Sequence, residues 1–261
     1  MSPFVLPLTF LGLVYAAMII GNERFHLFAQ ADHFPSPTRK YFAYAWLGLF
    51  LLVLGVLITA SSQRIPTAHE LEHVPFYSLF SLHAILIVFL VVWWLLSGRQ
   101  RLDEFLNIRS DRSGELVMGG FAIGVGGWIF TIVMALLIAA FLSAAGLMPK
   151  NPQPSPMIAW MAALPLWKKA TIVLSAMTVE EAFFRGWLQK RIGLFASTVL
   201  FALAHSGLGQ PLLLVGVFVI SIVIGFAFYR TKNLIPGIVA HGVFDAIQLF
   251  VIIPIAFKAI Q

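Results

Sequence analysis

Three groups of polar side chains interrupt the apolar C-terminal part of the chain at spacings that suit catalysis. Residues 180–185 read Glu-Glu-Ala-Phe-Phe-Arg, residues 201–205 read Phe-Ala-Leu-Ala-His, and residues 241–245 read His-Gly-Val-Phe-Asp. Carboxylates and imidazoles that meet in one site can activate a water molecule and stabilise developing negative charge. This chemistry requires a fold that brings three separate segments together.

Counting along helices places these groups at similar depth. At about 1.5 Å per residue from the nearest basic or polar helix end, Glu180 and His205 lie about 16 and 18 Å deep. On the same count His241 and Asp245 lie about 12 and 18 Å deep. An ionisable group inside a span costs about 2.5 to 3.5 kcal/mol, so it normally faces a protein interior or a wet cavity. We therefore expect the four side chains to share one site within the membrane.

Spacing also predicts different roles for the two adjacent glutamates. Glu181 and Arg185 are four residues apart on one helix face and should form an internal ion pair. Glu180 points about 100° away from Glu181 and can face a cavity. His241 and Asp245 are again four residues apart, so the carboxyl can orient the imidazole or share its proton.

The elements that carry these groups must be membrane helices. Of the 261 residues, 60% are hydrophobic and 11% are charged, whereas about 25% of residues are charged in a soluble domain. We expect an all-α polytopic membrane protein with about eight transmembrane helices. The expected spans are residues 4–20, 41–60, 76–97, 116–146, 170–189, 192–209, 210–229 and 234–256.

A proline-rich stretch divides these spans into two groups. Residues 148–165 contain five prolines and should form a stiff, irregular connector. This connector separates a four-span N-terminal region, residues 1–147, from a four-span catalytic core, residues 166–261. The run 116–146 is too long for one straight crossing, so we expect strong tilt, a protruding end, or a break near Gly124, Gly126 and Gly127.

Basic residues predict the orientation in the membrane. If the eight spans cross the membrane in alternating directions, twelve of the 17 Lys and Arg residues fall on one side of the membrane and five on the other. The Arg-rich side should be cytoplasmic, with both termini extracytoplasmic. The net charge of +6 thus reflects topology, and no basic run indicates a nucleic-acid partner. The absence of cysteine excludes disulfides and thiol chemistry.

The three motifs resemble those of the CAAX prenyl protease and bacteriocin-processing family, also called CPBP or Abi. Its pattern is EExxxR, then FxxxH, then HxxxN or HxxxD on successive helices. The resemblance covers residues 166–256, which also include the family-like segment Asn-Leu-Ile-Pro-Gly at 233–237. The first four spans match only in being hydrophobic, so they carry no functional expectation.

The resemblance implies an intramembrane protease of the glutamic type, a hydrolase. Glu180 would deprotonate a water molecule that His205 helps to position, while His241 and Asp245 would stabilise the oxyanion. The active-site cavity is expected to open mainly toward the cytoplasm. The substrate would be a membrane-associated protein or peptide in the lipid bilayer. Neither its identity, prenylated or not, nor the oligomeric state follows from the sequence.

The last motif departs from the commonest form of the family. Many members have Asn at the final position, and an amide can donate a hydrogen bond, whereas an ionised aspartate can only accept one. Two alternatives follow. Either Asp245 is protonated, or it holds His241 as an imidazolium that alone donates to the oxyanion.

Other interpretations of the polar residues remain open. The glutamate mechanism needs no cofactor, but Glu180, His205, His241 and Asp245 also form a possible zinc ligand set with an open position. Residues 69–73, His-Glu-Leu-Glu-His, match the HExxH zinc-hydrolase pattern, although in a short loop a solvated amphipathic turn is the simpler interpretation. A transporter or a non-catalytic binding or immunity protein is the competing class.

One histidine lies outside all of these motifs. His83 is isolated on a long apolar span. Such a residue is more often a core histidine bonded to a backbone carbonyl or a hydroxyl than a ligand. The sequence therefore predicts a packing role for His83.

Overall fold

The computed structural model describes residues 4–26, 28, 32–62, 67–147, 156–208 and 210–260. These residues form helices and connecting segments without strands, as expected where the bilayer offers no partners for an open backbone. The elements are α1 (Val5–Phe25), α2 (Pro37–Ser62), α3 (Ala68–His73), η1 (Phe76–Phe80), α4 (Ser81–Leu96), α5 (Leu102–Phe105), α6 (Ser113–Ala144), α7 (Pro156–Ala163), α8 (Leu166–Ser175), η2 (Ala176–Glu180), η3 (Ala182–Gln189), α9 (Lys190–Ala204), η4 (Ser206–Leu208), α10 (Pro211–Thr231), α11 (Ile235–Ala246), η5 (Ile247–Ile252) and α12 (Ile253–Ile260).

The number of helices that can cross a bilayer is lower than the eight expected. Within the described residues six helices are long and apolar enough, or seven if the bent pair Pro156–Ala163 and Leu166–Ala204 is one span. The expected span 192–209 is lost at Gly193, whose φ of 81° and ψ of 172° interrupt the helical run. Beyond it residues 194–204 extend only about 16 Å, too short for a hydrocarbon core about 30 Å thick. The protein is an all-α polytopic membrane protein, but the expected span 192–209 is a short helix.

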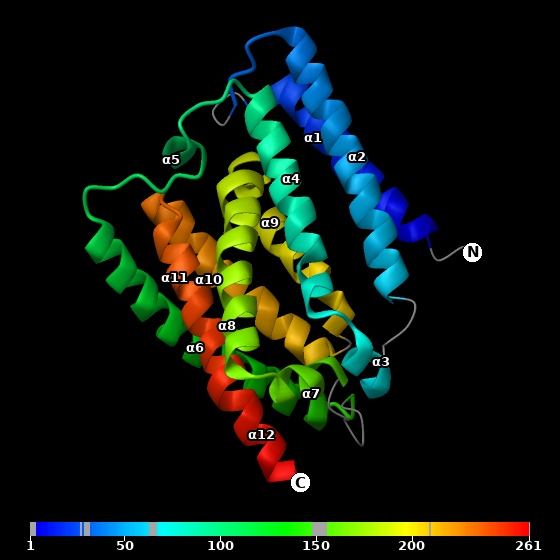
Figure 1. Cartoon of the computed structure of the whole chain (residues 1–261), viewed down its shortest axis with the longest axis vertical. Helices are drawn as coiled ribbons and strands as arrows, with labels where there is room; N and C mark the ends of the chain where they lie inside the picture. The colour runs from blue at the N-terminus through cyan, green and yellow to red at the C-terminus, as the bar shows by residue number, and fades with distance from the viewer. Residues whose placement is uncertain are drawn as a thin grey trace.

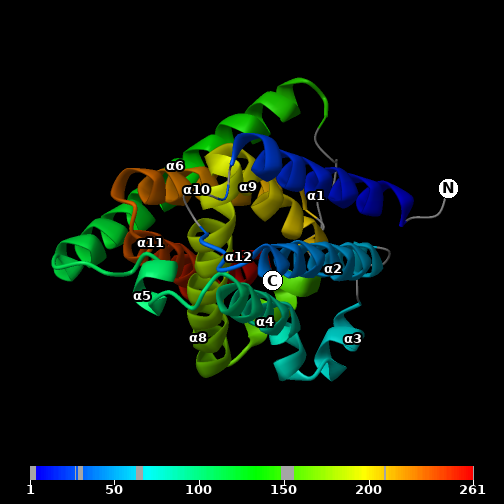
Figure 2. The same ribbon diagram turned by 90° about the horizontal axis from the view of Figure 1, so that it is seen from above.

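The long apolar run forms one uninterrupted helix. Helix α6 has 32 residues without a break, so of the three alternatives expected for this run a break near the glycines is excluded. Figures 1 and 2 both show α6 running obliquely beside α10 and α11. Gly120, Gly124 and Gly127 are buried in this contact, and a Cβ on Gly124 would lie 2.7 Å from the Cβ of Val243. The glycines therefore allow close helix packing and do not bend the chain.

The expected irregular connector is partly helical. Residues 148–155 lie outside the described residues, but Pro156–Ala163 form α7. A proline suits the first position of a helix because its fixed φ is helical and its missing N–H has no intrahelical partner there. The residues that follow Pro156 include good helix formers such as Met and Ala. The expectation of irregular structure is therefore wrong for residues 156–163.

A buried ion pair joins the N-terminal region to the C-terminal core. The guanidinium of Arg191 donates to Asp32 through Nε at 2.9 Å and Nη2 at 2.5 Å. The indole of Trp93 donates to the same carboxylate at 2.8 Å, and the Arg191 guanidinium also lies over the rings of Trp93 and Trp187. Together with the packing of α6 against α10 and α11, these contacts make the two regions share one core.

The basic connecting segments gather at one end of the molecule. In Figure 1 the end of α1, the start of α2, α5, the start of α9 and the α10–α11 connection lie in the upper half, whereas α3, α7 and α12 lie in the lower half. Lys190 donates to the Phe105 carbonyl and to Asn107, at 2.9 and 2.8 Å. Asn107 in turn donates to the carbonyl of Lys232 at 3.2 Å. The segments expected to be cytoplasmic are thus bonded to one another.

Candidate active site

Glu180 and Glu181 lie in the π-helical part of the helix that begins at α8. Residues Ala176–Glu180 and Ala182–Gln189 are π-helical, with Glu181 between the two stretches. A π-helical turn contains more residues than an α-helical turn, and such turns occur frequently at functional sites. The two carboxylates therefore leave this helix in different directions and meet different neighbours.

Glu181 is completely buried among polar partners. Its Oε1 lies 2.9 Å from Arg185 Nη1, so the ion pair expected from the sequence is present. The same oxygen lies 2.8 Å from Nδ1 of His241 on α11, a contact that the spacing did not predict. Arg185 also donates to the hydroxyl of Ser221 on α10 at 3.0 Å. Glu181 and Arg185 together thus connect three helices, and Glu181 does not line the cavity.

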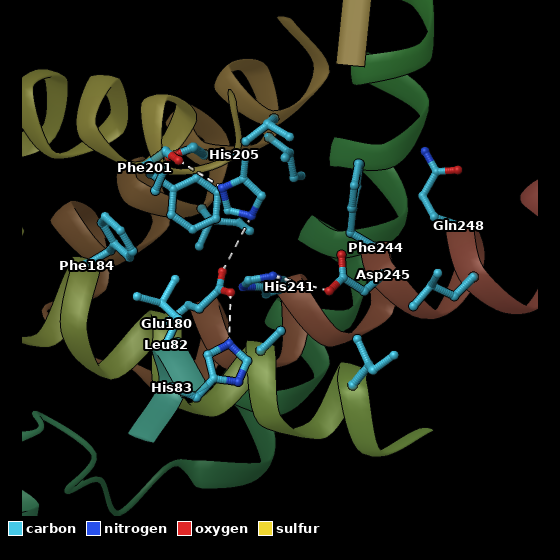
Figure 3. A pocket seen from close by; sticks show the side chains of 18 of the residues that line it. Leu82, His83, Glu180, Phe184, Phe201, His205, His241, Phe244, Asp245 and Gln248 are labelled. Carbon is cyan, nitrogen blue, oxygen red and sulfur yellow. Dashed lines mark hydrogen bonds and ion pairs between the residues drawn. The ribbon is translucent and has the colours of Figure 1, made fainter. Parts of the chain in front are cut away.

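Glu180 lies between two histidines from different parts of the chain. Its Oε1 is 3.1 Å from His83 Nε2, and its Oε2 is 3.8 Å from His205 Nε2. Figure 3 shows both imidazoles directed at this carboxylate. The side chains of Glu180 and His83 are each 12% exposed. Oε2 is buried and has no hydrogen-bond partner within the described part of the chain.

His205 lies at the C-terminal end of α9 and has a defined ring orientation. Its Nδ1 is 2.9 Å from the carbonyl oxygen of Phe201, which can only accept a hydrogen bond. Nδ1 therefore carries a proton, and Nε2 is the nitrogen that faces Glu180. In the neutral ring Nε2 is an acceptor.

His241 lies between two carboxylates. Its Nδ1 contacts Glu181, and its Nε2 is 3.4 Å from Oδ2 of Asp245, which is one helical turn further along α11. Both ring nitrogens can donate to these oxygens only when the ring is an imidazolium. Glu180, His205, His241 and Asp245 all line the same cavity, so the polar layer expected from depth counting is assembled at one place.

The cavity has a volume of about 670 Å³ and a mostly apolar lining. A concave apolar site with a few convergent polar groups is the usual form of a ligand-binding or active site. Beyond the polar layer the walls extend to η1, α7 and η4, through Phe80, Met157, Met161 and Gly207. Helix α7 lies at the end of the molecule opposite the basic connecting segments (Figure 1).

The possible zinc site is not assembled. Across the described ranges no three His, Asp or Glu side chains are arranged to hold a metal ion. Glu180 Oε2 and His205 Nε2 are 3.8 Å apart, while His241 is bonded to Glu181. The four side chains considered as zinc ligands therefore do not fit a metal centre in this arrangement.

The HExxH segment forms a capped helical turn. Residues 68–73 are α3, in which Glu70 accepts from the backbone N–H and hydroxyl of Thr67 at 2.9 and 3.0 Å. The ring of His73 contacts the carbonyl of His69 at 2.8 Å. This capping box and the local histidine contact agree with the interpretation as an amphipathic turn.

His83 is the site residue that the sequence interpretation missed. Its Nδ1 contacts the hydroxyl of Ser175 at 2.6 Å, so the expected bond to a hydroxyl exists. The other nitrogen contacts Glu180, which lies 97 residues further along the chain. A lone histidine in an apolar span was the only available signal, and no spacing rule relates it to so distant a partner.

Comparisons with known proteins agree with the C-terminal motifs. The model of the family described as Rce1-like, type II CAAX prenyl endopeptidase, matches residues 160–247. The uncharacterized protein YpbD of Bacillus subtilis (strain 168) is 39% identical over 69 residues, which cover 26% of this chain and 36% of YpbD. No solved structure matches the chain significantly. The matched segment carries the three motifs, so residues 160–247 are similar to the Rce1-like family of type II CAAX prenyl endopeptidases.

Proposed function

We propose that this protein is an intramembrane endopeptidase that hydrolyses a peptide bond of a membrane-associated protein or peptide in the bilayer. One observation carries the proposal. Glu180 and His205, on separate helices, face each other across 3.8 Å at the wall of a largely apolar cavity. The family of residues 160–247 is a protease family, which supports the same reaction class.

The proposed base is Glu180. A water molecule in contact with both Glu180 Oε2 and His205 Nε2 would donate one hydrogen to each, since carboxylate and neutral imidazole nitrogen are acceptors. As the water oxygen bonds to the substrate carbonyl carbon, its proton passes to Glu180. That proton then passes to the amide nitrogen, the C–N bond breaks, and a carboxylic acid and an amine are released.

The proposed oxyanion donor is His241. Glu181 accepts from Nδ1 at 2.8 Å and fixes the ring, which leaves Nε2 directed toward Asp245. The Nε2 to Asp245 separation of 3.4 Å is long, so a substrate carbonyl oxygen that becomes negative can compete for this N–H. In this proposal Asp245 keeps the imidazole protonated, and His241 alone donates to the oxyanion.

The central test is the exchange of Glu180 for Gln. Membranes from cells producing the wild-type protein and the Glu180→Gln variant are compared by mass spectrometry of protein termini. We expect the variant to lose a cleavage product that the wild type makes, with at least about a 100-fold lower rate on a peptide spanning that site. Glu115→Gln, at a glutamate whose side chain is 74% exposed on α6, is the matched control.

Two other outcomes would contradict the proposal. Identical processing by wild type and by folded Glu180→Gln and His205→Ala variants would favour a transporter or a non-catalytic binding protein. Loss of activity on chelation, with recovery on added zinc, would favour the metal-dependent mechanism. The glutamate mechanism predicts unchanged activity with a chelator.

A further inference from the structure

His83 connects the N-terminal helices to the carboxylate proposed as the base. It lies in the first turn of α4, whereas Glu180 lies in η2. Its two ring nitrogens contact Ser175 Oγ at 2.6 Å and Glu180 Oε1 at 3.1 Å. Ser175 precedes Glu180 by five residues, a separation that the π-helical stretch places on one face.

The charge of Glu180 determines which groups donate in the two hydrogen bonds of His83. An ionised Glu180 can only accept, so Nε2 of His83 must carry a hydrogen and donate it to Oε1. In the neutral ring Nδ1 is then an acceptor, and the hydroxyl of Ser175 donates to it. The other case is an imidazolium, in which both nitrogens donate and Ser175 accepts. In either case His83 donates to Glu180.

This donation determines which carboxylate oxygen is available for chemistry. Oε1 is held by His83, while Oε2 has no hydrogen-bond partner within the described ranges and faces His205. A rotation of the carboxylate would break the His83 contact in a site where both side chains are nearly buried. We propose that His83 is a positioning residue that keeps Oε2 of Glu180 directed at the water site.

The inference rests on the proposed function and extends it to the N-terminal region. The motifs and the matched family segment lie after residue 159, yet one of the two imidazoles around Glu180 comes from α4. Helix α4 of the N-terminal region would therefore complete the active site.

The test compares two exchanges at His83. His83→Leu removes the donor, whereas His83→Gln places an amide N–H near the position of Nε2. Activity is measured per folded protein on an internally quenched peptide that spans the cleavage site lost in Glu180→Gln. We expect His83→Leu to lower kcat about 10- to 100-fold, as for other orienting partners. KM should change little, and His83→Gln should recover most of kcat. His33→Leu, at an exposed histidine, is the control.

A second exchange keeps the test decisive if His83→Leu does not fold. Ser175→Ala leaves the imidazole in place but removes its Nδ1 partner, so kcat should fall by less than in His83→Leu. Thr178→Val, on the same helix, removes a hydroxyl that among the described residues bonds only to its own backbone turn at Leu174 and Ser175. A purely structural role predicts lower stability in the Leu and Ala variants with wild-type kcat per folded molecule, and that result would overturn the inference.

The parallel Glu180→Gln measurement separates the two possible failures. If Glu180→Gln is as active as the wild type, Glu180 is not the base and the proposed mechanism itself fails. If Glu180→Gln is inactive while folded His83→Leu has the kcat of the wild type, only the positioning role fails. Equal loss of kcat in His83→Leu and His83→Gln would also contradict positioning by hydrogen-bond donation.

Discussion

Glu180 and Glu181 are adjacent in the chain but have different surroundings. Glu181 is fully buried, with Arg185 on its own helix and His241 on another. Glu180 lines the cavity and contacts His83, with His205 beyond the reach of a direct hydrogen bond. Removal of one partner from a buried ion pair destabilises the fold, whereas a carboxylate that lines a cavity can react.

The first prediction at this scale concerns stability. Glu181→Ala should lower the free energy of unfolding by about 3 to 5 kcal/mol, because Arg185 is left as a buried charge without its partner. The yield of folded protein should fall at least as much as the specific activity. Thermal unfolding in detergent measures the effect, with Glu115→Ala as the exposed control. An unchanged melting temperature would contradict the role of Glu181 as a structural ion-pair partner.

The second prediction concerns the aspartate of the last motif. Asp245→Asn should retain activity within about tenfold, because Glu181 still holds the His241 ring and an amide can itself donate to an oxyanion. Asp245→Leu should lose more, since His241 Nε2 then has no polar neighbour on α11. Initial rates on the same peptide measure both variants. An equally large loss in both variants would contradict this prediction and would show that the negative charge of Asp245 itself is required.

At the scale of elements, close contact between α6 and α11 determines where His241 lies. Pro236, Ala240 and Val243 of α11 pack against the buried glycine face of α6. A Cβ on Gly124 would lie 2.9 Å from the carbonyl oxygen of Ala240, directly before His241 in the chain. Displacement of this backbone would move the imidazole relative to Glu181.

The corresponding prediction uses two glycines of the same helix. Gly124→Ala should destabilise the protein by about 1 to 3 kcal/mol through overpacking and should lower kcat as α11 shifts. Gly126→Ala should be neutral or stabilising by up to about 1 kcal/mol, because nothing lies within 4 Å of its Cβ position and alanine favours helix. Unfolding and activity assays on both variants test the contrast. Equal effects at the two positions would contradict the packing argument.

At the scale of the whole molecule, the basic end and the cavity lie apart. The hydrogen-bonded segments around Asn107, Lys190 and Lys232 form one end, and the cavity lining extends to α7 at the other. If the Arg-rich segments are cytoplasmic, the cavity reaches the extracytoplasmic end. The expected opening of the cavity toward the cytoplasm stays a prediction, and the position of α7 makes it testable together with the orientation.

Labelling of single introduced cysteines tests this orientation, and no native cysteine of this chain can react, since the chain has none. With a membrane-impermeant maleimide on intact cells, His69→Cys on α3 should react and Arg101→Cys before α5 should not, as the charge bias predicts. Met157→Cys, in the cavity wall, should react from the same side as His69→Cys. The reverse pattern for His69 and Arg101 would contradict the charge-based orientation. Labelling of Met157 only from the Arg101 side would restore a cytoplasmic opening.

The sequence by itself determined the properties that depend on composition or on spacing within one helix. Low charge and long apolar runs indicated a helical membrane protein, and the i,i+4 separation of Glu181 and Arg185 predicted an ion pair that is present at 2.9 Å. The ion pair follows from the geometry of a single helix, and the helical fold follows from the need of the backbone to form its own hydrogen bonds in the bilayer. Neither depends on which helices lie next to one another. The three motifs were likewise readable as a family pattern.

Only the tertiary structure decided the contacts between helices. Depth counting gives a position along the helix axis but neither the rotation about that axis nor the neighbouring helix. The contact of His83 with Glu180 and that of His241 with Glu181 span 97 and 60 residues. These contacts arise from side-chain packing between helices, which is set by the whole assembly and not by any local pattern. For the same reason the short helix after Gly193 and the cavity that joins the polar groups emerged only from the assembled bundle.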